Sequence, residues 1–171
     1  MRMDHVSIVP FVDSIATSLL SNLKRFEASF RPIVRQNAAI AMGRLAIVAS
    51  DRLISSGVFA EIFVPWCTIM RRMRTDDEKV SAVRGFLVCV EKSPQLGAVP
   101  ENFQRLHELI ASMFPPPPIL EGGLRKIVMA YKESLGADWQ RLWNSLPVEL
   151  QYRLNHAFAL GFDVHAPTST A

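Results

Sequence analysis

Two segments of this chain decide its fold, and they are Asn37-Ala-Ala-Ile-Ala-Met-Gly43-Arg-Leu45 and, 42 residues later, Lys79-Val-Ser-Ala-Val-Arg-Gly85-Phe-Leu87. When Gly43 is aligned with Gly85, small and apolar residues fall at matching helical positions. A weaker third copy, Leu124-Arg-Lys-Ile-Val128, follows 41 residues after its counterpart in the second segment. The chain therefore contains a diverged internal repeat.

The repeat length indicates the fold class. A period of about 40 to 47 residues with two helices per unit is typical of HEAT and armadillo arrays. The sequence therefore predicts an all-α HEAT-repeat α-solenoid of stacked antiparallel helix pairs with right-handed stacking. In such arrays each unit buries its apolar stripe against its neighbours, so the work of the protein is done by a surface.

Apolar periodicity places the helices at about 6–25, 33–49, 58–73, 75–91, 100–114 and 120–135, followed by a short helix after Asp138 and one opened by Pro147. Residues 50–57 are predicted to be a break with room for a short turn of helix, and Thr75 with Glu78 fits a capping box. We expect a repeat segment over 1–162, with three to four helix pairs, and a disordered tail over 163–171.

Gly43 and the first helix each lead to a further prediction. A glycine inside a helix is unfavourable by about 1 kcal/mol relative to alanine, so Gly43 predicts close approach of a neighbouring helix. The apolar stripe of the first helix has no preceding partner in the chain. Its Val9, Val12, Leu19 and Leu20 therefore predict an open apolar face and self-association of the isolated chain.

Composition excludes several classes of protein. With 49% hydrophobic and 20% charged residues, the 171-residue chain can bury a core, and its net charge of +3 is too small to imply a nucleic-acid partner alone. Cys67 and Cys89 lie in apolar helical runs and are predicted to be buried thiols. The start lacks a secretory signal and no run of 18 apolar residues occurs, so we expect a soluble, intracellular protein without a membrane span.

The sequence lacks the usual patterns of catalytic chemistry. No histidine is paired with Cys, Asp or Glu at metal-ligand spacing, and no phosphate-binding loop or nucleophile elbow is present. The acids Asp76, Asp77 and Glu78 are better explained by helix capping than by metal binding. We therefore predict no enzyme activity, no cofactor and no metal site.

Several motifs in order resemble one known family. The residues that carry this likeness are the Asn37–Leu45 segment, Val64-Pro-Trp-Cys67, Asp77-Glu-Lys79, Arg84-Gly85, Asp138-Trp139 and Leu146-Pro147. Together they are similar to the C-terminal end of the transportins, which are nuclear import receptors (karyopherins) of the importin-β superfamily. The likeness extends from about His5 to Phe162, and the run Pro115–Pro118 departs from the family pattern.

The resemblance implies binding of cargo proteins through their nuclear-localisation segments and movement between cytoplasm and nucleus. It also implies release by the GTPase Ran and contact with nucleoporins, both through a full-length receptor. The chain would then be a fragment or a truncated gene model that lacks the repeats that chiefly bind Ran and most of the cargo pockets. No cargo-contact residue can be transferred by motif.

Helical phase gives the candidate contact residues. The second helix of each pair should line the concave side, as the family implies, and the residues off its apolar stripe are the surface candidates. They are Glu61, Thr68, Arg71 and Arg72 in one unit and Glu101, Gln104, Arg105 and Glu108 in the next. Two alternatives remain: a HEAT-repeat scaffold in another assembly and, less favoured, nucleic-acid binding through Arg71, Arg72, Arg74 and Arg105.

Overall fold

The computed structural model describes residues 9–25 and 31–161, and every regular element in these ranges is a helix. They are a 3-10 turn Val9–Phe11 and the helices α1 (Val12–Lys24), α2 (Pro32–Ser55), α3 (Val58–Met70), α4 (Asp77–Lys92), α5 (Pro94–Gly97), α6 (Pro100–Ser112), α7 (Pro118–Leu135), α8 (Ala137–Asn144) and α9 (Val148–Phe158). The predicted tail 163–171 and the predicted first turn at residues 6–8 lie outside the described residues.

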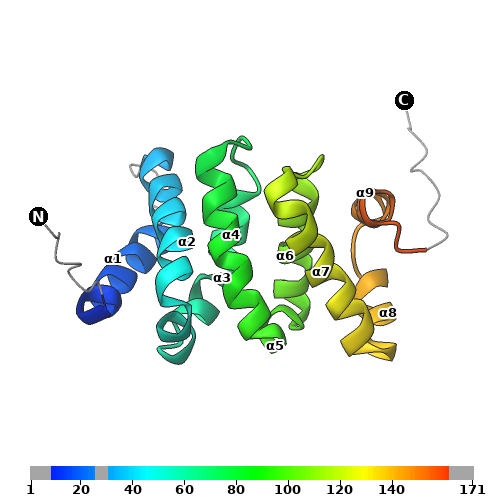
Figure 1. The fold of residues 1–171 in the computed structure, drawn as a ribbon, viewed down its shortest axis with the longest axis horizontal. Coiled ribbons are helices and arrows are strands. Elements are labelled where there is room, and N and C mark those ends of the chain that lie inside the picture. The colour runs from blue at the N-terminus through cyan, green and yellow to red at the C-terminus, as the bar shows by residue number, and fades with distance from the viewer. Residues whose placement is uncertain (1–8, 26–30, 162–171) are drawn as a thin grey trace, which may run out of the picture.

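The helices form an elongated stack that follows chain order, from α1 at the blue end to α9 at the red end (Figure 1). Helix α2 packs on α4, and α4 packs on α7, which makes a first layer. Helix α1 packs on α3, α3 on α6 and α6 on α9, which makes a second layer. Alternate helices of the chain thus fall into the same layer, as stacked helix pairs require, and the predicted all-α repeat fold is confirmed.

The two repeat glycines meet at the contact between α2 and α4. A Cβ atom built on Gly85 would lie 1.9 Å from the carbonyl oxygen of Gly43, and one built on Gly43 would lie 2.5 Å from the carbonyl oxygen of Ala82. Both distances are far below van der Waals contact, so the two backbones touch only because neither residue has a side chain. The predicted close approach of a neighbouring helix at Gly43 is confirmed.

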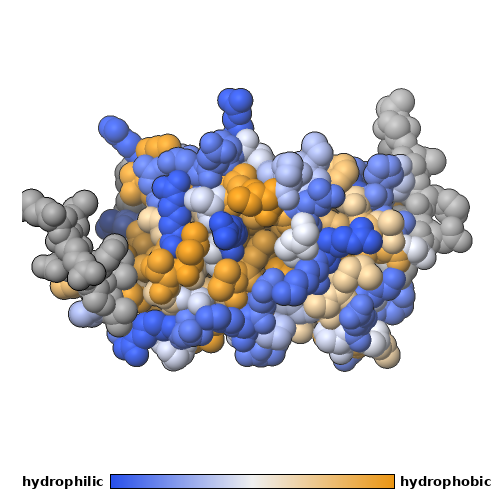
Figure 2. Space-filling model, viewed as in Figure 1, coloured by the Kyte–Doolittle hydropathy of each residue, from blue (hydrophilic) through white to orange (hydrophobic). Residues whose placement is uncertain are grey.

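The third copy of the repeat has Lys126 where the second has Gly85, and the packing is looser there. Lys126 Nζ lies 3.3 Å from Glu91 Oε2 on α4. Between α4 and α7 a groove of about 330 Å³ opens, lined by Val90, Ile127 and Tyr131 among others. Figure 2 shows apolar surface on the face formed by α2, α4 and α7.

Aromatic side chains join the two layers. Phe86 of α4 stacks on Trp66 of α3 with ring centroids 4.1 Å apart, and it also contacts Phe59 and Phe63. Trp66 is fully buried and donates a 2.7 Å hydrogen bond from Nε1 to the carbonyl of Ala39 on α2. The polar end of the indole is thereby satisfied inside the core.

Helix α2 extends further than the sequence predicted. The helix kinks at the predicted end, where Ala49 has non-helical angles (φ −138°, ψ 27°), and the expected short turn of helix after it is longer than predicted, because Ser50–Ser55 are all helical. Lys92 Nζ, from the end of α4, lies 2.8 Å from both Ser50 Oγ and Asp51 Oδ1. This contact links the second part of α2 to the end of α4.

Two smaller predictions also need correction. The N-cap of α4 is Asp76, whose carboxylate accepts a 2.9 Å hydrogen bond from the Lys79 amide, and not Thr75. On α1, Val12 is buried and Leu19 and Leu20 are partly buried against the core, so these three residues do not form the predicted open apolar face, and the side chain of Val9 lies outside the described part of the structure.

Other sequence-level expectations are met by the described residues. Cys67 and Cys89 are both buried free thiols, as predicted. Within the described ranges, no helix combines the length and apolar character needed to cross a membrane.

Candidate partner-binding surface

The eight residues chosen by helical phase all lie on the second layer. Glu61 and Glu101 lie in the first turns of α3 and α6, and Arg71 and Arg72 follow the last turn of α3. Thr68 lies on α3, and Gln104, Arg105 and Glu108 lie on α6. Because α3 packs on α6, the structure brings the two predicted groups onto neighbouring helices.

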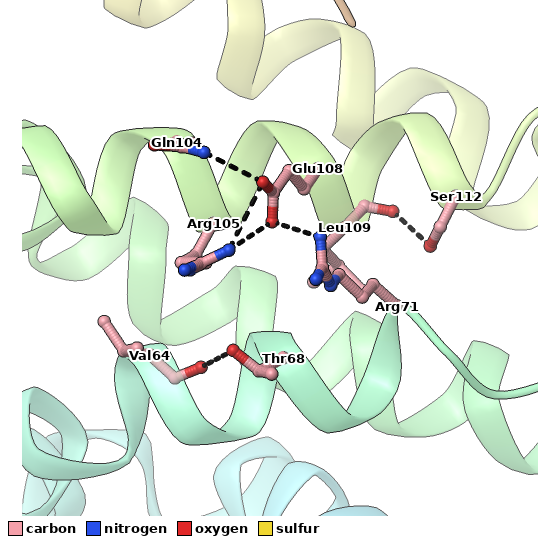
Figure 3. Close-up of polar contacts among 8 residues, drawn as sticks. All are labelled: Val64, Thr68, Arg71, Gln104, Arg105, Glu108, Leu109 and Ser112. Atoms are coloured by element: carbon pink, nitrogen blue, oxygen red, sulfur yellow. Dashed lines mark hydrogen bonds and ion pairs between the residues drawn. The ribbon is translucent and has the colours of Figure 1, made fainter. Parts of the chain in front are cut away.

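The centre of this surface is a polar cluster around Glu108 (Figure 3). The Glu108 carboxylate accepts hydrogen bonds from Arg71 Nη1 at 2.6 Å and from Arg105 Nη1 at 2.9 Å, and from Gln104 Nε2 at 3.0 Å. The Glu108 side chain is only 14% exposed, while Arg71 and Arg105 are 28% and 29% exposed. Such partial burial makes charge-assisted hydrogen bonds stronger than those at the open surface.

The single Glu108 carboxylate is paired with the guanidinium groups of both Arg71 and Arg105, so the cluster has a net positive charge. The Nε atoms of both Arg71 and Arg105 are buried and make no hydrogen bond within the part of the chain that the structure describes. The cluster therefore links α3 to α6 while leaving donor capacity on both arginines.

The remaining candidates differ in how fully they are engaged. Thr68 Oγ1 donates a 2.8 Å hydrogen bond to the carbonyl of Val64 in its own helix. Glu61 is paired with Lys24 of α1. Glu101 and Arg72 are exposed and form no ion pair among the described residues. These last two have side chains open to a partner.

A cleft of about 410 Å³ lies beside the Glu108 cluster, where α3 ends against α6 and α9. Its lining is formed by Arg71, Arg72, Glu108, Ala111, Ser112, Pro147, Glu149, Leu150 and Arg153. A smaller cavity of about 130 Å³ lies on the other side of Arg72, lined also by Pro32, Arg35, Gln36, Thr68 and Ile69. The sequence analysis did not select Glu149 and Arg153, because it applied helical phase only to the two units before α9.

A buried cation supports the turn that carries Arg71 and Arg72. Lys79 has no exposed surface, and its Nζ donates to the carbonyl of Met73 at 3.0 Å and to Ser112 Oγ at 3.3 Å. Burial lowers the pKa of Lys79 to about 8, against a smaller opposing effect of the Asp76 carboxylate. Lys79 thus ties the turn after α3 to Ser112 at the end of α6, and Ser112 is one of the residues that line the cleft.

Several known proteins are similar in sequence to most of this chain. The chain is 31% identical over 92% of its length to Transportin from Dictyostelium discoideum. It is 26% identical over 87% of its length to Transportin-1 from Mus musculus and to Transportin-1 from Homo sapiens. Its relatives are transportins. No family model matches the chain.

The likeness to transportins covers one part of those proteins. The chain spans 16% of the length of each of the three. A match over 158 of its 171 residues takes in the α3–α6 surface together with the α2–α4 glycine contact. The resemblance to the transportins predicted from the motifs is thereby confirmed.

Proposed function

We propose that the chain acts as part of a nuclear import receptor of the transportin type, by binding other proteins and not by catalysis. The identity of 31% to a transportin over 92% of the chain carries this proposal. In this role the chain contributes a surface for the nuclear-localisation segment of a cargo protein. A longer receptor containing it would bind Ran in its GTP form and nucleoporins, and would move between cytoplasm and nucleus.

The second layer is the side proposed for cargo, and its charge distribution supports a particular mode of binding. Acidic side chains lie toward the N-terminal ends of α3 and α6, at Glu61 and Glu101. The arginines lie toward the C-terminal end of α3 and the middle of α6. A basic localisation segment would therefore pair with Glu61 and Glu101, and Thr68 and Gln104 would offer hydrogen bonds beside it.

The proposal is tested by measuring the binding of a fluorescently labelled basic localisation peptide to the chain by anisotropy. We expect Glu101→Gln to weaken binding by about threefold to fivefold, since it removes one exposed charge pair, and Glu61→Gln to weaken binding less, because Glu61 is already paired with Lys24. Glu133→Gln, an exposed position on α7 in the first layer, makes the same change of charge and should leave binding unaltered.

Release is the second part of the test. In the longer receptor, addition of Ran loaded with GTP should free the bound peptide, and Ran loaded with GDP should not. Equal weakening by all three substitutions would show attraction to net charge alone, and no binding at all would assign the chain a scaffold role. Either result contradicts cargo binding on this surface.

A further inference from the structure

We propose that the cleft at the junction of α3, α6 and α9 binds an acidic peptide segment. This inference does not depend on the import role, because it rests on the side chains that line the cleft. It concerns the opposite end of α3 from Glu61, so a basic segment and an acidic segment could occupy the second layer together.

The charge of the cleft favours an anion. Arg71, Arg72 and Arg153 line it together with Glu108 and Glu149. Glu108 already accepts hydrogen bonds from both Arg71 and Arg105, so its negative charge is shared between two cations. The cleft lining therefore has three arginines against two carboxylates, and one of the two carboxylates, Glu108, is already paired with arginines.

Arg72 and Arg153 have guanidinium N–H groups that could donate hydrogen bonds to a bound carboxylate. Arg72 is exposed and lines both this cleft and the smaller cavity beside it, and its side chain makes no hydrogen bond or ion pair within the described ranges. Arg153 directs Nη2 to the carbonyl of Ala111 at 2.9 Å, which holds its guanidinium against α6. A guanidinium fixed in this way keeps its other N–H groups for a carboxylate, with little loss of side-chain freedom on binding.

The remaining lining favours a peptide over a nucleic acid. Ala111, Pro147 and Leu150 supply apolar surface for an aliphatic side chain of the ligand. None of the lining residues is aromatic, so there is no platform on which a base could stack. Glu149, exposed at the start of α9, would repel a continuous phosphate backbone, whereas a peptide can place its carboxylates selectively.

The test uses a short fluorescein-labelled peptide of aspartate and glutamate around a central leucine, titrated with the 171-residue chain and followed by anisotropy. We expect Arg72→Ala and Arg153→Ala each to raise Kd by about fivefold, the effect of losing one partly exposed charge pair. Arg84→Ala on α4 and Arg125→Ala on α7 remove the same charge from exposed positions of the first layer, so they are matched controls and should not change Kd.

Three outcomes would overturn the proposal. The controls could weaken binding as much as the cleft variants, or the peptide could fail to bind. Alternatively, single-stranded DNA could bind with a steeper salt dependence and lose affinity in the same two variants, which would assign the cleft to phosphates. Circular dichroism of Arg72→Ala, whose exposed side chain makes no hydrogen bond or ion pair in the described structure, separates loss of binding from loss of fold.

Discussion

At the residue scale, His107 combines full burial with a defined protonation state. Its ring is enclosed by aromatic neighbours, with Phe103 at 4.0 Å and Trp139 at 6.0 Å between ring centroids. Nδ1 lies 2.7 Å from the carbonyl of Phe103, and because a carbonyl can only accept, Nδ1 carries the proton. Burial lowers the pKa of His107 to about 4, although the hydrogen bond to Phe103 opposes this effect.

Because the pKa of His107 is lowered in the folded protein, we expect the free energy of unfolding to decrease in acid. An unfolded histidine has a pKa of about 6.5, so between that pH and about 4 the unfolded chain binds a proton that the folded chain does not. The free energy of unfolding should therefore fall as the pH is lowered through this window, by about 2 to 3 kcal/mol.

Urea denaturation at pH 7 and pH 4.5 measures this difference, and His107→Leu is the variant to compare. The variant should be less stable at pH 7 but should lose clearly less stability on acidification than the parent chain. An identical loss in both proteins would mean that other groups cause it.

At the element scale, the contact between α2 and α4 depends on the absence of side chains. We expect Gly85→Ala to destabilise the protein by about 3 kcal/mol, because the new methyl group would displace the backbone of α2 and not a flexible side chain. Thermal or urea denaturation measures this effect.

Gly122 on α7 is the matched control for that substitution. A Cβ atom there meets nothing within 4 Å, and the residue is helical, so Gly122→Ala should stabilise the protein by about 0.5 to 1 kcal/mol. If both substitutions had the same sign, close backbone packing would not be what distinguishes Gly85.

The same scale shows which features local sequence can predict. Apolar periodicity located the helices, and the repeated glycines predicted a close contact, because both are properties of short segments. The part of α2 beyond Ala49 is contacted by Lys92, 41 residues from Asp51, and no local pattern encodes that contact. Asp76 and Thr75 are both good caps, and only the packing of α4 chooses between them.

The candidate surface was predictable to a similar degree. Helical phase selected Arg71, Arg105 and Glu108 from α3 and α6 and the turn after α3, which the structure places in one layer, because phase depends only on spacing. Their mutual pairing depends on the distance between α3 and α6, which is a tertiary property. The contribution of Arg153 depends on how α9 meets α6, where the repeat pattern has faded.

At the scale of the whole molecule, stability should vary along the stack. Each helix contacts mainly its neighbours, so opening at one place need not unfold the rest. The α2–α4 contact is the most extensive among the described helices, whereas the contacts of α8 and α9 are few. Native-state hydrogen exchange should therefore show the slowest amides in α2 and α4 and the fastest in α8 and α9, and uniform exchange would indicate a single cooperative unit.

The two helix contacts within the first layer, α2–α4 and α4–α7, differ in how closely the helices pack, and this difference has a mechanical consequence. Between α2 and α4 backbone rests on backbone, and neither helix can slide or tilt without a clash. Between α4 and α7 the junction is bridged by the long side chains of Lys126 and Glu91 over an open groove, and such a bridge can stretch. The array is therefore stiff at one joint and compliant at the next, so a load applied to its two ends would bend it at the α4–α7 joint.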